Sequence, residues 1–214
     1  MRRIAEARRK NDNFLRWRER MKVIGKIKSE YPPLIRNGDL AELIGVVLGD
    51  GHIGTFPRSE SLRITANSNN QGFVRRYARM IEKVFDKRPS VAKVRDSNAA
   101  TITIYQKHIS SRLGIPTGSR KAVKTSVPSW ILREKKFVVR YLRGLYEAEG
   151  SYSIHEPTYT HKLSFSNKNQ SLLNNVVRLL RVIGLSPHYD SLRVQISKKD
   201  HVARAIKLLK FREY

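Results

Sequence analysis

The sequence repeats itself at one constant offset of 99 positions. This shift takes Asp50-Gly51 onto Glu149-Gly150 and, with no gap, the strand-like pattern of residues 62–66 onto that of residues 161–165. It also takes Asn70-Gln71 onto Asn169-Gln170, and the apolar helical positions that follow onto apolar positions of the second copy. One offset is thus shared by an acidic-glycine pair, a strand pattern and a helix pattern. This indicates an internal duplication, so we expect two similar halves.

Each copy carries helical and strand patterns in the same order. The first begins with a short apolar helix, Leu40 to Gly49, for which Asp39 and Glu42 have the spacing of a capping box. Periodicity then predicts strands near His52–Phe56 and Leu62–Asn67, a helix near Gln71–Phe85, strands near Val91–Arg95 and Thr101–Gln106, and a short helix over 107–113. In the second copy it predicts a helix over 135–148, strands near Ser151–Ile154 and Lys162–Ser166, a helix at Gln170–Ile183, strands near His188–Tyr189 and Leu192–Ser197, and a helix at Asp200–Leu209. The order αββαββα in each half predicts an α+β fold of tandem repeats.

The duplication also sets the expected domain boundaries. We expect a basic N-terminal helical segment over residues 1–38, a first half over 39–113, a linker over 114–130 and a second half over 131–214. In the N-terminal segment, the apolar residues Phe14, Trp17, Met21 and Ile24 or Ile27 recur at helical spacing. Pro32-Pro33 should end that helix, and Asn37-Gly38 should form a turn. The segment could pack on the body of the protein through Trp17, or it could act as an arm that contacts DNA phosphates. One segment could have both roles.

The charge of the chain narrows the choice of partner. Its 43 Lys and Arg against 18 Asp and Glu give a formal net charge of +25, which calls for a polyanionic partner. Nucleic acid is favoured over a membrane surface, because the positive charge is spread along the chain and no apolar run approaches the roughly 18 residues that span a bilayer. The chain has no cysteine, which excludes disulfides and thiolate zinc sites. We therefore expect an intracellular protein, in the cytoplasm or nucleoid of a prokaryote or in an organelle.

The predicted strands alternate between apolar and polar residues, as in an antiparallel sheet with one face on helices and the other open. Ile64, Ile102 and Ile104 should point inward, whereas the outward positions are rich in Arg, Lys, Gln, Thr and Tyr. Such side chains can hydrogen-bond base edges and phosphates. The candidate DNA-contacting residues are Arg63, Thr65, Asn67, Lys93, Arg95, Thr103, Tyr105 and Lys107 in the first copy, and Lys162, Ser164, Arg193, Gln195, Ser197 and Lys199 in the second.

Asp50 and Glu149 each stand at the C-terminal end of an apolar helix, where the helix dipole is already negative. An exposed carboxylate there is disfavoured by roughly 0.3–1 kcal/mol. Its presence at both repeat-equivalent positions indicates a compensating cation. These two acids are the candidate catalytic residues.

Small residues on both helices should bring the two acids together. Gly45 and Gly49 in the first helix, and Gly144 and Ala148 in the second, allow close crossing about a pseudo-two-fold axis. Two adjacent carboxylates would both stay ionised if divalent cations bind them. Oxygen-only ligands favour Mg²⁺, or Mn²⁺, with the backbone carbonyls of Gly49 and Ala148 as further ligands.

The segments Leu43–Gly51 and Leu142–Gly150 resemble the two motifs of a LAGLIDADG homing endonuclease of the single-chain, two-repeat type. The second segment is close to the family consensus, and the first keeps the glycines and the terminal Asp-Gly. The resemblance covers about residues 39–210. It implies two saddle-shaped sheets that grip the major groove of double-stranded DNA. It also implies a monomer, often intron-encoded, that hydrolyses phosphodiesters on both strands at a long asymmetric site, with Asp50 and Glu149 as metal-binding acids.

A basic residue or a Gln usually assists catalysis in this family. At the ends of the second strands this chain has Ala66-Asn67 and Phe165-Ser166 instead of a Gln-Lys type pair. The candidates for the assisting role are Lys162, Arg63, Lys121 and Lys124. Two alternatives use the same fold without cutting, an RNA maturase and a DNA-binding regulator. Retention of both acids favours the endonuclease, because a pure binder has no need of them.

Overall fold

The computed structural model describes residues 13–25 and 30–214. The chain divides into two compact units, residues 1–33 and 34–214, which we describe separately. In the first unit, α2 spans Asn13–Val23 and contains Phe14, Trp17 and Met21 of the predicted helical spacing, and the rings of Phe14 and Trp17 stack with centroids 5.8 Å apart. The helix ends before Ile24 and well before Pro32-Pro33, where the sequence predicted its end. Ile27 lies outside the described residues.

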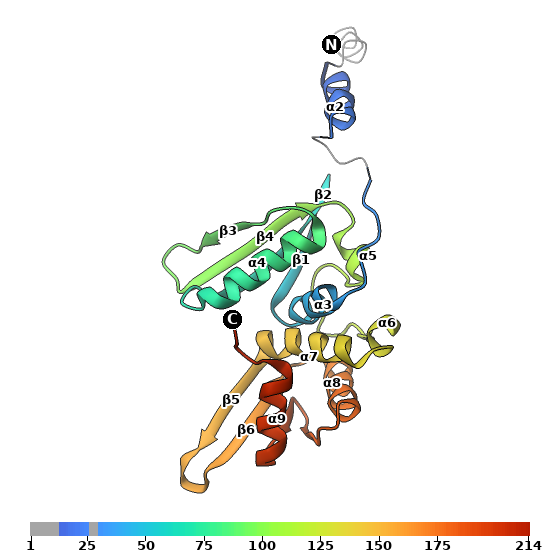
Figure 1. Ribbon diagram of the computed structural model, residues 1–214. Coiled ribbons are helices and arrows are strands. Elements are labelled where there is room, and N and C mark those ends of the chain that lie inside the picture. The colour runs from blue at the N-terminus through green and yellow to red at the C-terminus, as the bar shows by residue number, and fades with distance from the viewer. Residues whose placement is uncertain (1–12, 26–29) are drawn as a thin grey trace. The chain divides into compact units, whose positions relative to one another are not determined.

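The larger unit contains the predicted αββαββα order twice (Figure 1). The first half consists of α3 (Gly38–Asp50), β1 (Gly51–Phe56), β2 (Ser59–Asn67), α4 (Gln71–Phe85), β3 (Ser90–Lys93), β4 (Ala99–Gln106) and α5 (Ile109–Leu113). The short α6 (Ser129–Leu132) precedes the second half. That half consists of α7 (Lys135–Glu149), β5 (Gly150–His155), the 3-10 helix η1 (Glu156–Thr158), β6 (Thr160–Ser166), α8 (Gln170–Val182), β7 (His188–Asp190), β8 (Arg193–Ile196) and α9 (Lys199–Leu209).

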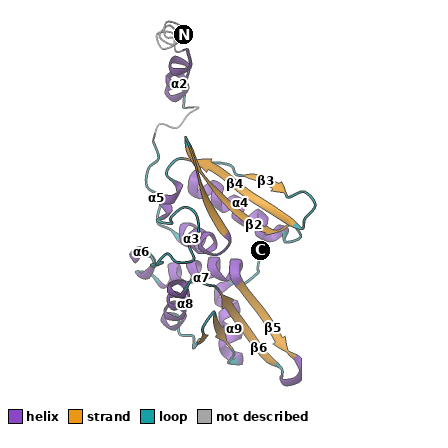
Figure 2. Cartoon of the chain, turned by 180° about the vertical axis from the view of Figure 1, so that it is seen from behind, coloured by secondary structure: helices purple, strands orange, loops and turns teal. Residues whose placement is uncertain are grey.

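Each half forms one antiparallel sheet of four strands, in the order β1-β2-β4-β3 and β5-β6-β8-β7. The expected α+β class and the tandem repeat are therefore confirmed. In both sheets the apolar side chains of the two central strands are buried, among them Ile64, Ile102, Phe165 and Val194. Helices cover that face of each sheet (Figure 2).

The strand register corrects one part of the repeat alignment. Leu62 pairs with Ile53 in the first sheet, and Leu163 pairs with Tyr152 in the second. The β5–β6 hairpin is thus two residues longer than the β1–β2 hairpin, and Leu62 corresponds to Leu163 instead of His161. The ungapped offset of 99 is wrong within these second strands. It holds again from Gln71 and Gln170, where α4 and α8 begin.

The two central helices, α3 and α7, pack directly against each other through small residues. A Cβ atom added to Gly45 would clash with the backbone oxygen of Tyr141, and one added to Gly144 would clash with that of Glu42. The close approach expected from the glycine spacing is confirmed. The helix backbones are therefore in contact, and the other sides of both helices contribute to one continuous apolar core.

The predicted capping box is wrong. Helix α3 begins at Gly38, and Asn37 is its N-cap, with its side chain accepting a hydrogen bond of 2.9 Å from the Leu40 N–H. Glu42 is fully buried and accepts hydrogen bonds from Arg76 and Arg140 of other helices. Because the Glu42 carboxylate has charged partners across the interface, it is not available to the helix N-terminus.

Candidate metal centre and nucleic-acid interface

The two acids predicted as catalytic are the last residues of the two central helices. Asp50 ends α3 and Glu149 ends α7. The helix ends touch, since a Cβ atom built on Gly49 would lie 2.5 Å from the Ala148 Cβ and 3.1 Å from the Glu149 Cγ. The crossing of α3 and α7 thus brings Asp50 and Glu149 to the same place.

The surroundings disfavour the charged forms of both acids. Burial, and secondly the charge of Glu149, raises the pKa of Asp50 from 3.8 to about 7. Burial also raises the pKa of Glu149. Asn167 donates a long hydrogen bond of 3.5 Å to Glu149. Within residues 13–25 and 30–214, neither acid forms an ion pair with a basic side chain. Two adjacent carboxylates without a protein cation form a site that favours a bound cation.

The available oxygen donors fit Mg²⁺ better than a metal ion whose ligands must all come from the protein. In the described part of the chain, no group of three or more His, Cys, Asp or Glu side chains could hold a metal ion. Mg²⁺ keeps several waters and is commonly held by one or two carboxylates together with substrate phosphates. Asp50 and Glu149 could supply such a pair, with the adjacent carbonyls of Gly49 and Ala148 as further oxygen donors.

A cavity of about 230 Å³ opens beside the end of α3. Its lining includes Gly49, His52, Lys121 and Asn167. Arg120 also lines it, and its Nη2 donates to the carbonyl oxygens of Val47 at 2.9 Å and Gly51 at 2.5 Å. A guanidinium at this position compensates the negative end of the helix dipole beside Asp50.

The end of α7 has a similar partner, because the Arg212 Nη2 donates to the Gly150 carbonyl oxygen at 3.4 Å. At each of the two helix ends, an arginine side chain therefore donates hydrogen bonds to backbone carbonyl groups close to the acid in the sequence. Neither arginine neutralises the carboxylate itself.

The strand register places most of the candidate DNA contacts on the open faces of the sheets. Arg63 pairs with Thr103 and Ser61 with Tyr105, so these side chains share the face opposite Ile64. In the second sheet Ser164 pairs with Gln195, and Ser166 pairs with Arg193. Of the other candidates, Thr65 and Lys162 lie on these faces and Asn67 ends β2. Arg95, Lys107 and Ser197 follow strands β3, β4 and β8, whereas Lys199 is the first residue of α9.

Two candidates are placed less favourably. Lys93 pairs with Ala100, a buried core residue, so it lies on the helix-covered side of its sheet. Ser164 is on the polar face but is only 8% exposed.

Comparison with known proteins agrees with this geometry. The sequence model of the LAGLIDADG-like domain matches residues 136–213, which hold nearly all of the second half. A mesophilic variant of the homing endonuclease I-DmoI superposes with a TM-score of 0.54 at 18% identity, over 80% of this chain and 94% of that one. I-DmoI in complex with DNA and Mn gives a TM-score of 0.54 at 17% identity, over 80% and 96% of the two chains. Both halves are included in these superpositions.

The chain thus has the two-repeat LAGLIDADG fold, and its second half matches the LAGLIDADG-like domain.

The LAGLIDADG fold also occurs in full-length DUF199/WhiA from Thermatoga maritima, with a TM-score of 0.56 at 14% identity over 86% of this chain and 59% of that one. Comparison with curated protein sequences gave no match. No helix among the described residues is both long and apolar enough to cross a membrane.

The four candidate assisting residues lie in different places relative to the ends of α3 and α7. Lys121 and Lys124 are both exposed, but only Lys121 lines the cavity beside α3. Arg63 pairs with His52, the second residue of β1, on the open face. Lys162 pairs with Ser153, the fourth residue of β5, and so lies further along its hairpin. Of the four, Lys121 is thus the one that lines this cavity, and Arg63 lies opposite the second residue after Asp50.

Sequence reasoning missed Arg120, Arg212 and Asn167. All three come from segments outside the strands and long helices, and their contacts join residues far apart in the chain. Asn167 is one position after Ser166, where an assisting side chain was sought. Periodicity gives no signal for the arginines, because neither belongs to a repeated pattern.

Proposed function

We propose that this LAGLIDADG protein is a site-specific endonuclease that uses divalent metal ions to cut both strands of double-stranded DNA. The observation that carries the proposal is the pair formed by Asp50 and Glu149, two carboxylates at touching helix ends that form no ion pair with any described residue. The likeness to I-DmoI, solved with DNA and Mn, supports it. Because each half supplies one acid, the active unit is a single chain.

The residues of the site have distinct roles in the proposed reaction. Asp50 and Glu149 would hold Mg²⁺ or Mn²⁺, together with the carbonyls of Gly49 and Ala148. Such ions lower the pKa of bound water and polarise the scissile phosphate. Arg120 positions the end of α3 through the Val47 and Gly51 carbonyl groups.

Lys121 is the best placed of the four assisting candidates, because it lines the cavity beside Asp50. An ammonium group there would stabilise negative charge on the phosphate. The open sheet faces would fix the position of the duplex, and most of their contacts would be to phosphates.

The two halves present different side chains to DNA, which favours an asymmetric target. By register, Arg63 corresponds to Ser164 of the second half. We therefore expect a long target without two-fold symmetry, spanning about two helical turns. Selection of cleaved sites from a randomised duplex library, with Mg²⁺ and without it, would identify this target.

Substitution of either acid tests the proposal on the selected target. Asp50→Asn and Glu149→Gln should each lower the double-strand cleavage rate by about 100-fold or more, since metal ions supply several kcal/mol of transition-state stabilisation. DNA affinity in EDTA should remain close to that of the wild type. Glu82→Gln, which removes an exposed carboxylate on α4, is the matched control and should cut normally. In the same assay Lys121→Met should slow cleavage more than Lys124→Met.

Normal double-strand cleavage by both acid variants would overturn the endonuclease assignment. A wild-type protein that binds the selected duplex but never cuts it would instead support a non-cutting regulator. The fold alone does not decide between these functions.

A further inference from the structure

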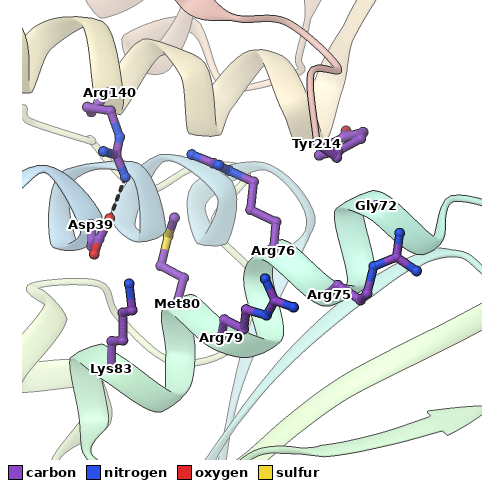
Figure 3. A pocket seen from close by; sticks show the side chains of 9 residues that line it. All are labelled: Asp39, Gly72, Arg75, Arg76, Arg79, Met80, Lys83, Arg140 and Tyr214. Atoms are coloured by element: carbon purple, nitrogen blue, oxygen red, sulfur yellow. Dashed lines mark hydrogen bonds and ion pairs between the residues drawn. The ribbon is translucent and has the colours of Figure 1, made fainter.

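A second basic site lies on the other side of the first sheet. Helix α4 packs on the core through residues such as Phe73, Tyr77 and Ile81. Its remaining side, together with α3, α7 and the C-terminal Tyr214, lines a groove of about 330 Å³ (Figure 3). The complete lining is Asp39, Gly72, Arg75, Arg76, Arg79, Met80, Lys83, Arg140 and Tyr214.

Five of these residues are basic, and they fall into two groups. Arg76 and Arg140 are held by the buried Glu42, with Arg76 donating at 2.7 and 2.9 Å, and Arg140 also pairs with Asp39. In contrast, Arg75, Arg79 and Lys83 form no side-chain hydrogen bond or ion pair in the described part of the chain. The groove thus combines two fixed guanidinium groups with three exposed cations that pair with no acid among the described residues.

The three unpaired cations form a regular row along α4. They are spaced four residues apart, so successive members are about 6 Å apart along the helix axis. Figure 3 shows Arg76, Arg79 and Lys83 extending from α4 toward α3 and α7. Like charges at this spacing destabilise a helix. The row is therefore unfavourable for α4 in isolation, and a bound polyanion would compensate it.

The duplicated half shows that the fold does not require this row. Arg75, Arg79 and Lys83 correspond to Asn174, Arg178 and Val182 on α8. The corresponding side of α8 lines a different groove, in which only Arg178 and Arg181 are basic. The equivalent side of α8 is thus exposed to solvent with fewer cations than the side of α4 that lines the groove.

We propose that the α4 groove binds the phosphates of a nucleic-acid strand other than the duplex on the sheets. The cations stand in a line, which suits successive phosphates of one strand better than a single compact anion. The sheet separates the groove from Arg63 and Thr103 on the open face, so one duplex on that face does not fill it. This site is independent of the proposed cleavage reaction.

The test measures binding of a short labelled single-stranded DNA to the full chain in EDTA, with the sheet faces saturated by unlabelled duplex. The wild type should still bind the strand. The triple variant Arg75→Gln/Arg79→Gln/Lys83→Gln should bind it about tenfold or more weakly. The plot of log affinity against log salt concentration should become shallower, and the magnitude of its slope should decrease by about 2. The reason is that each of the three lost phosphate contacts contributes about 0.7 for single strands.

A matched variant controls for the loss of three charges. Arg178→Gln/Arg181→Gln/Lys207→Gln removes three exposed cations from α8 and α9 and should leave strand binding nearly unchanged. Equal weakening by both triple variants would overturn the proposal, as would complete displacement of the strand by duplex from the wild type. Displacement by inorganic tripolyphosphate at lower concentration than the strand would also overturn it, since the ligand would then be a free phosphate chain. Because the site is independent of the proposed cleavage reaction, the triple variant of α4 should still cut the selected target. Its cleavage rate therefore separates a failure of this proposal from a failure of the endonuclease proposal.

Discussion

Two single residues, Asp50 and Glu149, end the touching helices α3 and α7, and the pKa of each carboxyl group is raised by its surroundings. Asp50 and Glu149 were found because the same unfavourable placement occurs twice in the sequence. Arg120 and Asn167 join the site from loops, and only the packing of the halves decides their contacts. Glu42 shows the same limit, because its spacing fits a helix cap but its carboxylate is buried against Arg76 and Arg140.

The raised pKa of Asp50 makes stability depend on pH. Between about pH 4 and pH 7, the folded metal-free protein binds more protons at Asp50 than the unfolded chain does. Ionisation of Asp50 therefore lowers the stability of the fold as pH rises through this window. Above about pH 7 the full destabilisation is present. Asp50→Asn removes the cost, so the variant should be more stable than the wild type at pH 8 in EDTA.

Thermal unfolding of both proteins across this pH range checks the prediction. The difference in Tm should vanish toward pH 4, and a gain of 1 kcal/mol corresponds to about 2–4 °C for a chain of this size. Mg²⁺ should raise the Tm of the wild type at pH 8 more than that of the variant. Parallel pH profiles for the two proteins would show that Asp50 ionises normally.

At the scale of elements, local patterns predicted the long helices well and the hairpin lengths poorly. Helix α4 has the predicted bounds, because its amphipathic pattern begins directly after the capping Asn70. The longer β5–β6 hairpin was missed, since an apolar-polar alternation still matches when it is shifted by two residues. The side of α4 that lines the basic groove is set by α7 and the C-terminus, and no local pattern contains that information.

The contact between α3 and α7 can be tested with one methyl group. In an open helix, Gly→Ala should stabilise by about 1 kcal/mol through helix propensity. Gly144→Ala should instead destabilise by about 1–3 kcal/mol, because the added Cβ meets the backbone of Glu42. Urea unfolding measures the change, and Ala203→Gly on the exposed side of α9 reports the propensity effect alone. A stabilised Gly144→Ala variant would mean that the helix backbones are further apart.

At the scale of the whole molecule, duplication and charge together determine what the chain can do. Two similar halves put one acid each at a shared position and leave two polar sheet faces open. A net charge of +25 supplies many possible phosphate contacts, on the sheets and in the α4 groove. The fold class and the pairing of the halves follow from the repeat, but the location of the second basic site follows only from the tertiary structure.

The affinity for duplex DNA should therefore fall steeply with salt. With six to ten phosphate contacts, the affinity would drop by about 10³–10⁵ between 50 and 200 mM salt. Fluorescence anisotropy of a labelled duplex in EDTA gives this slope. A flat dependence would show that the basic faces do not track the phosphate backbone.

In the proposed site, two carboxylates from opposite halves hold one group of divalent ions beside DNA. Titration of Mn²⁺ into the protein–duplex complex, followed by electron paramagnetic resonance, tests this arrangement. The wild type should bind Mn²⁺, and Asp50→Asn and Glu149→Gln should each weaken that binding by about tenfold or more. If the doubly substituted protein binds Mn²⁺ as tightly as the wild type does, the paired acids are not the metal centre.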